Sequence, residues 1–311
     1  MNTLIYWAAR SVVVVIQALP LRMVAHIGRV GGFITYLLAG RYRRIAIESL
    51  TLCFPEKSAE EIRRIARENF RRLGENYGCA IRTAAMSPEE LKPYFECLGV
   101  EKIAKHQPGA GPQNRIMAIG HFGNFELYAR VGGFAPGFTF GTTFRSLNQP
   151  GLNQVLLSLR NTADCRFFER RADITALKEA MSSTGLMLGL LADQHGVTGM
   201  RLPFFGRECS TSIAPAVFAL RYECPLHTAI CYRTGLARWR IETGDEIPTK
   251  VDGHPRSVAD IMLDVNREFE KAIRRDPANW FWVHRRWKPP GRKVKRVVDG
   301  KRSKIINPNA A

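Results

Sequence analysis

The sequence places a histidine and a glutamate five residues apart at the end of an apolar run. Residues 115–126 read RIMAIGHFGNFE, so His121 follows a buried-strand pattern and Glu126 opens a helix-like segment. Side chains five apart on one continuous helix diverge by roughly 140°, so they meet only if the chain breaks between them. Gly123 and Asn124 supply that break, with Asn124 as the expected N-cap. A histidine held by a carboxylate can take a proton from a hydroxyl, and we predict such a pair here. The alternative is an exposed histidine beside a glutamate that only favours a helix start.

The segments that would position this pair alternate between strand and helix patterns. Helical periodicity dominates from residue 45 to about residue 85, and Ser58 begins a capping box for a helix through Leu73. This alternation predicts an α/β fold, a mixed sheet covered by helices, with catalytic residues at strand ends and loops. Strand patterns cover 116–119, 138–143, 186–192, 227–232 and 238–243, and helix patterns cover 125–131, 152–160, 173–182, 213–222 and 258–274.

Other polar and aromatic residues follow the expected strands. Asp193 and Gln194 end one strand pattern, and Phe204 and Phe205 precede a glycine turn that suits either an apolar substrate or simple packing. Residues 277–288 combine three tryptophans with cations, which is typical of a membrane interface or of an ordinary aromatic core. Three further cationic or amide side chains lie near the proposed site: Arg145, Asn148 and Arg160.

The first forty residues predict a membrane-associated helical segment. Residues 4–21 are apolar except for Arg10, Ser11 and Gln17, and eighteen residues is the short end of a bilayer span. Arginines follow this run and none precedes it, which places the bulk of the chain in the cytoplasm under the positive-inside rule. The alternative is two helices packed on the globular part or lying in the interface. We divide the chain into an anchor (1–40), a catalytic domain (41–290) and a basic tail (291–311).

Composition narrows the class of partner. The 311 residues carry a net charge of +18, which favours anionic partners such as phosphate head groups, membrane surfaces, acidic proteins or nucleic acid. No zinc finger or RNP motif supports nucleic-acid binding. The seven cysteines form no Cys-x-x-Cys pair, and neither Gly-x-Gly-x-x-Gly nor a Walker A motif is present. We therefore expect no metal, no cofactor and no nucleic-acid partner.

Taken in order, these motifs resemble the late acyltransferases of lipid A biosynthesis, the lauroyl/myristoyl group within the lysophospholipid acyltransferase superfamily. The resemblance runs from the N-terminal helix to Lys288. It departs from the family at Phe144-Arg145-Ser146, where Tyr-Arg-Pro is frequent, and at Phe125, where tryptophan is frequent. The matching stretches are SLTLCFP (49–55), HFGNFE (121–126), Arg145 with Asn148, Asp193-Gln194, PFFG (203–206) and WFWVHRRWK (280–288).

The resemblance implies an O-acyltransferase in which His121 is the general base and Glu126 its orienting carboxylate. Arg145, Arg160 and Asp193 then become candidates for binding or positioning substrate, beside Asn148, Gln194, Phe204 and Phe205. The acyl chain would pass from a thioester, with acyl carrier protein favoured over coenzyme A, to a hydroxyl of a lipid A precursor or similar anionic membrane glycolipid. The expected location is the bacterial inner membrane, with the catalytic domain facing the cytoplasm. The main alternative is a glycerophospholipid or mannolipid acyltransferase that uses acyl-CoA.

Overall fold

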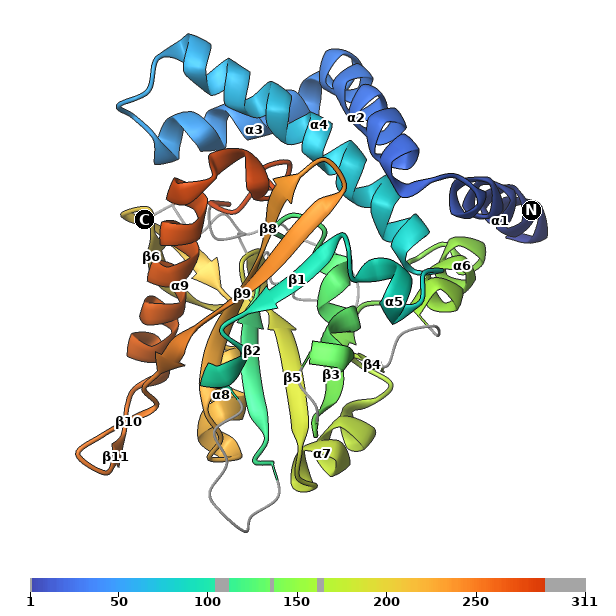
Figure 1. Cartoon of the computed structure of the whole chain (residues 1–311). Helices are drawn as coiled ribbons and strands as arrows, with labels where there is room; N and C mark the ends of the chain where they lie inside the picture. The colour runs from blue at the N-terminus through green and yellow to red at the C-terminus, as the bar shows by residue number, and fades with distance from the viewer. Residues whose placement is uncertain (1, 104–111, 135–136, 161–164, 289–311) are drawn as a thin grey trace, which may run out of the picture.

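A seven-stranded mixed sheet forms the centre of the computed structural model, which describes residues 2–103, 112–134, 137–160 and 165–288 (Figure 1). The strand order is β1-β9-β8-β2-β5-β3-β4, and every neighbouring pair is parallel except β8 and β9. The predicted mixed α/β sheet is therefore confirmed. Its strands are β1 (Phe95–Leu98), β2 (Arg115–Ile119), β3 (Thr139–Phe144), β4 (Cys165–Glu169), β5 (Leu186–Leu191), β8 (Leu226–Gly235) and β9 (Arg238–Ile247).

Six strands of the described chain had no predicted counterpart. They are the edge strands β1 and β4, the hairpin of β6 (His195–Phe204) with β7 (Arg207–Thr211), which pairs antiparallel outside the main sheet, and the two short strands of a second hairpin. β1 has only four residues, too few to establish an alternating pattern, and β4 carries Arg166 and Glu169 among its five residues. A second small hairpin joins β10 (Lys250–Val251) to β11 (His254–Pro255).

Helices cover both faces of the sheet. One hydrophobic layer joins Ile116 and Leu188 of the sheet to α8 (Ala214–Arg221) and α9 (Val258–Arg275). Met117 and Met187 point to the other face of the sheet, because successive side chains of a strand alternate between its two faces. On that face they belong to a second hydrophobic layer, which also contains Leu127 of the 3-10 helix η2 (Phe125–Phe134) and Leu21 and Val24 of α2 (Leu21–Leu38). Beyond the four N-terminal helices, the described chain also contains α5 (Pro88–Leu91), α6 (Pro150–Arg160), α7 (Ile174–Ser182), η1 (Val100–Lys102) and η3 (Pro277–Asn279).

Four helices begin the chain: α1 (Asn2–Ala18), α2, α3 (Gly40–Cys53) and α4 (Ala59–Thr83). The Ser58 capping box is present, as predicted, but α4 continues ten residues beyond the predicted end at Leu73. In Figure 1, α2, α3 and α4 lie together at one end of the sheet, and α1 extends sideways toward α6. The backbones of α2 and α4 approach so closely at Gly28 that an added Cβ would lie 2.4 Å from the carbonyl oxygen of Gly74.

No single helix in the described part of the chain is long and apolar enough to cross a membrane by itself. The pair α2 and α3 meets the criterion together, but the two helices are bent by 92° at their junction. The expected span over residues 4–21 is divided between α1 and the start of α2, with Pro20 at the N-cap of α2. The predicted basic tail, 291–311, lies outside the described residues.

Candidate active site

His121 meets a carboxylate from the neighbouring strand. Its ring nitrogen Nδ1 lies 2.9 Å from Oδ1 of Asp193, and its backbone N–H donates to Oδ2 of the same carboxylate at 2.8 Å. The parallel register explains this contact, because Ile119 of β2 pairs with Leu191 of β5 and each functional residue follows two positions later. Asp193 is fully buried, whereas the His121 side chain keeps 17% of its surface exposed. The carboxylate that orients His121 is therefore Asp193.

Glu126 has a different partner from the one expected. Its Oε1 accepts a hydrogen bond at 2.8 Å from Nη2 of Arg160, the last residue of α6. The predicted proximity is correct to the extent that His121 and Glu126 line one small cavity. Asp193, and not Glu126, occupies Nδ1 of the imidazole, and the Glu126 carboxylate bonds to Arg160. A five-residue spacing could suggest proximity but not which strand end supplies the nearer carboxylate.

The turn between His121 and Glu126 packs against β8 and η3. Gly123 has φ +49°, and an added Cβ would lie 2.6 Å from the Cys231 carbonyl oxygen, so only glycine fits here. Its N–H donates to the Asn279 carbonyl, so it is not free to bind a reacting oxygen. Asn124 stands at the predicted N-cap position, immediately before η2, and its carbonyl accepts from the Leu127 N–H, but its buried side chain makes no capping hydrogen bond.

Charge at the site is set by burial and by hydrogen bonds. Burial acts to raise the pKa of Asp193, but the His121 ring and the two His121 hydrogen bonds outweigh it and lower that pKa to about 2. The carboxylate is thus ionised at neutral pH. Burial lowers the pKa of the nearby His284 to about 4, so its ring is neutral at neutral pH and adds no charge to the site.

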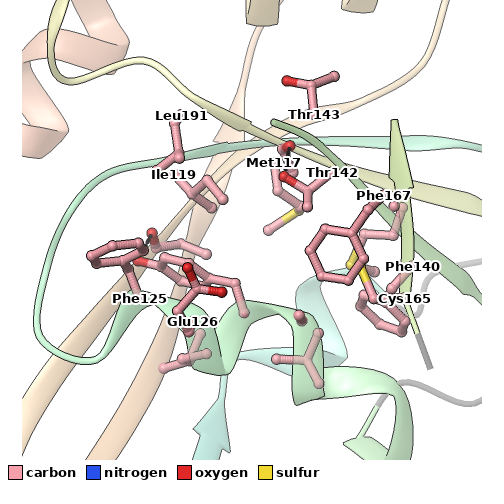
Figure 2. Close-up of a pocket in the computed structure, with 18 of the residues that line it drawn as sticks. Met117, Ile119, Phe125, Glu126, Phe140, Thr142, Thr143, Cys165, Phe167 and Leu191 are labelled. Atoms are coloured by element: carbon pink, nitrogen blue, oxygen red, sulfur yellow. Dashed lines mark hydrogen bonds between the residues drawn. The ribbon is translucent and has the colours of Figure 1, made fainter. Parts of the chain in front are cut away.

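A large apolar cavity opens beside the pair, between β2, β3 and β5 of the sheet and η2 (Figure 2). It encloses about 900 Å³, including space continuous with solvent. Figure 2 shows Phe125 and Glu126 at one end and Phe140, Phe167 and Cys165 at the other. The Arg160 guanidinium lies over the Phe144 and Phe167 rings and against Glu126. The lining includes Ile103, Met117, Ile119, Phe140, Met187 and Leu191.

A smaller cavity lies on the His121 side. It is lined by His121 and the turn that follows it, together with Tyr77 of α4 and Phe281. Phe125 and Glu126 line both cavities, so they form the boundary between the imidazole and the apolar space.

The remaining predicted site residues separate into two groups. Arg145 and Asn148 are exposed after β3 and line neither cavity, and the Gln194 carbonyl accepts a hydrogen bond from Arg286. Phe204 is fully buried and stacks on Trp287, and Phe205 packs against Phe54. Of the two alternatives left open by the sequence, the structure shows packing for both phenylalanines, which lie in the aromatic core and line neither cavity.

Comparison with protein-family models matches residues 1–289 to the bacterial lipid A biosynthesis acyltransferases. The chain belongs to this family. Two relatives are each 26% identical over 295 residues, covering 91% of this chain and 90% of the relative. One is the lipid A biosynthesis palmitoleoyltransferase of Escherichia coli (strain K12), and the other is a lipid A biosynthesis acyltransferase of Shigella flexneri. The family resemblance drawn from the motifs is confirmed.

Two residues that support the site of this acyltransferase were missed in the sequence. Tyr128 of η2 donates to the Ala229 carbonyl and accepts from the Cys231 N–H, which fixes η2 to β8. Trp280 donates its indole N–H to Asp193 at 2.8 Å. The sequence did contain a signal for Trp280, since the tryptophan motif was recognised, but its contact with a strand end 87 residues away is purely tertiary.

Proposed function

We propose that this enzyme transfers a fatty acyl chain from an acyl thioester to a hydroxyl of a lipid A precursor or a similar membrane glycolipid. One observation carries the proposal: His121, hydrogen-bonded to the buried Asp193, lines a small cavity that shares Phe125 and Glu126 with the large apolar cavity. The relatives are named as lipid A biosynthesis enzymes, one of them a palmitoleoyltransferase, which fits an acyl chain in that cavity.

His121 acts as the general base. When the Nδ1–H group donates a hydrogen bond to Asp193, the lone pair of Nε2 is available to take the proton of the acceptor hydroxyl. The hydroxyl oxygen then attacks the thioester carbonyl, and the tetrahedral intermediate expels the thiolate, which receives the proton back from the imidazolium. The ionised Asp193 stabilises that imidazolium, as the buried acid does in hydrolase triads. General-base assistance contributes roughly two to four powers of ten to the rate.

Glu126 and Arg160 act as a pair at the boundary of the two cavities. The carboxylate holds the guanidinium, and the guanidinium lies against the aromatic end of the apolar cavity. A cation there suits a developing negative charge on the thioester oxygen or a phosphate of the acceptor. In this account Glu126 serves the reaction by placing Arg160, and Asp193 takes the part first given to Glu126.

The donor is an acyl carrier protein. Such carriers are acidic, and a net charge of +18 on the enzyme favours an acidic protein that arrives with its acyl chain attached. The acceptor is anionic as well, so added salt should weaken both encounters.

Membrane attachment uses the N-terminal helices. α1 and α2 leave many large apolar side chains exposed, among them Trp7 at 60% and Leu38 at 80%. Such a surface suits burial at the level of the lipid head groups, and nearby arginines suit anionic lipids. We propose attachment to the cytoplasmic side of the bacterial inner membrane. The exposed set is Leu4, Trp7, Val12, Val14 and Val15 on α1 and Met23, Ile27, Val30, Ile34, Leu37 and Leu38 on α2.

A matrix of donors and acceptors tests the proposal. Purified enzyme in membranes is given acyl carrier protein or coenzyme A thioesters, each with a lipid A precursor, a lysoglycerophospholipid or a mannolipid. The expected product is an acylated lipid A precursor formed fastest from the carrier-protein thioester. Transfer only to the glycerol or mannose lipids would replace the acceptor, and no transfer from any thioester would overturn the proposal.

A further inference from the structure

The carboxylate that orients His121 is itself held by a tryptophan. Three N–H groups surround the buried Asp193 side chain. Oδ1 faces the His121 ring nitrogen, while Oδ2 accepts both the His121 backbone N–H and the Trp280 indole N–H, each at 2.8 Å. The two donors on Oδ2 leave Oδ1 as the oxygen directed at the imidazole.

Trp280 is held by backbone hydrogen bonds as well as by the packing of its ring. Its backbone forms a β-bridge with Phe122, the residue after the proposed base, and its carbonyl accepts from Asn69 of α4 at 2.6 Å. Its ring is almost completely buried and meets the Trp282 ring edge-on at 4.7 Å. The indole N–H is therefore presented to Asp193 by a rigid neighbourhood, and it does not have to be ordered during the reaction.

We propose that Trp280 is a positioning residue for acyl transfer, whose indole N–H locks the Asp193 carboxylate so that Oδ1 stays on His121 Nδ1. This inference rests on the proposed function. An aspartate carboxylate can rotate about its Cβ–Cγ bond, and rotation would break the contact that sets the imidazole tautomer. Groups outside the metal or catalytic contacts of a site often tune it in this way.

The electrostatic surroundings make this one hydrogen bond important. The charged or titratable groups that face Asp193 are the His121 ring, Tyr128 from η2, and His284 and Arg286 from the C-terminal segment. His284 is neutral at pH 7, and Arg286 donates hydrogen bonds to Gln194, Ser210 and Thr211. Without the indole bond the carboxylate can turn away from Nδ1, and an imidazolium that loses this contact is less stable.

The Trp280→Phe variant tests the proposal, and Trp282→Phe is its matched control. Both tryptophans are almost completely buried in one cluster, but the Trp282 indole donates to the Pro277 carbonyl and not to a carboxylate. We expect Trp280→Phe to lower kcat roughly 10- to 100-fold, part of the general-base contribution, with KM unchanged. Its acidic limb of kcat against pH should move to lower pH, because the imidazolium is then less stabilised. Trp282→Phe should keep the wild-type pH profile, even if its Tm falls as far.

A measurement without turnover separates this inference from the proposed function. The Nδ1 proton of His121, hydrogen-bonded to a carboxylate, gives a downfield proton resonance that is assigned by its absence in His121→Gln. We expect Trp280→Phe to shift or broaden this resonance and Trp282→Phe to leave it in place. Identical resonances and pH profiles in both variants would overturn the positioning role. An enzyme that transfers no acyl chain, yet shows the expected resonance change, would contradict the proposed function alone.

Discussion

His121 and Asp193 are register partners extended two residues past the ends of adjacent parallel strands. β2 and β5 pair Ile119 with Leu191, and the two functional side chains come together beyond that last pair. A parallel sheet therefore builds the base and its carboxylate from segments 72 residues apart. The same edge receives Trp280 from the C-terminal segment, so three distant stretches meet at one carboxylate.

Replacing Asp193 by asparagine should remove most of the activity. The amide is similar in size, but it cannot stabilise the imidazolium and can present its NH₂ to Nδ1, which favours the wrong tautomer. We expect kcat to fall by roughly 10³ to 10⁴, as in hydrolase triads with this change. Initial rates with a saturating thioester measure this effect. Activity within a few-fold of wild type would show that the imidazole does not depend on Asp193.

Glu126 and Arg160 should behave as one unit in a double-mutant cycle. Because the carboxylate acts by holding the guanidinium, Glu126→Gln and Arg160→Gln should each lower kcat/KM, and the double variant should lose about as much as the worse single one. Steady-state kinetics of the four proteins measure the coupling. The matched control is the exposed ion pair of Arg201 and Glu208, whose neutral variants should retain wild-type kinetics. Losses that multiply in the double variant would mean independent roles.

The apolar cavity should set the length of the transferred chain. Gly189 shares the cavity face of β5 with Met187 and Leu191, and a Cβ there would lie 3.1 Å from the end of the Ile119 side chain. Gly189→Val should therefore fill space and lower kcat/KM for long acyl donors relative to short ones, roughly tenfold for a lost methylene contact. Competition between two thioesters measures the ratio.

Gly141→Ala is the control for this change in chain length. A Cβ at Gly141 would meet Phe168 and Leu186, which belong to the hydrophobic layer on the other face of the sheet. Its donor preference should stay at the wild-type ratio even if stability decreases. If Gly189→Val kept the wild-type ratio of kcat/KM for long and short acyl donors, this cavity would not set the chain length.

Burial of neutral His284 should make the protein less stable in acid. Burial lowers the pKa of His284 to about 4, against an ordinary value near 6.5, so the unfolded chain binds the extra proton first. The contribution of His284 to the free energy of unfolding is complete above pH 6.5, and about 3 kcal/mol of it is lost as the pH falls toward 4. Other histidines titrate in this range, so the test compares wild type with His284→Phe.

Urea unfolding of both proteins between pH 7 and pH 4.5 supplies the measurement. Phenylalanine keeps the stacking of this ring on Phe281. The wild-type free energy of unfolding should fall more steeply with acid than that of the variant. Parallel slopes would show that His284 does not titrate abnormally.

The sequence predicted the fold better than the pairing within the site. Periodicity located β2, β5, α9 and the capped start of α4, because each carries a local apolar pattern or a local capping box. The partner of His121 depended on strand order, which local patterns do not contain. Asp193 was noticed as a polar strand end, yet only the adjacency of β2 and β5 makes it the carboxylate that holds His121.

The aromatic residues show the same limit. From the sequence, Phe204 and Phe205 could belong either to the core or to the wall of a substrate site. The hairpin of β6 and β7 decides between them, because it places Phe204 against Trp280 and Trp287. The environment of Gly123 is likewise set by tertiary structure. Its N–H donates to the carbonyl of Asn279, a residue 156 positions later.

The rate of acyl transfer by His121→Ala is the most direct measurement of the central claim. The variant loses the base but keeps the apolar cavity and the N-terminal helices. The account predicts transfer below detection from a thioester that the wild-type enzyme uses, with unchanged membrane binding and a folded protein by circular dichroism. Wild-type-like transfer by this variant would contradict the assignment of His121 as the general base.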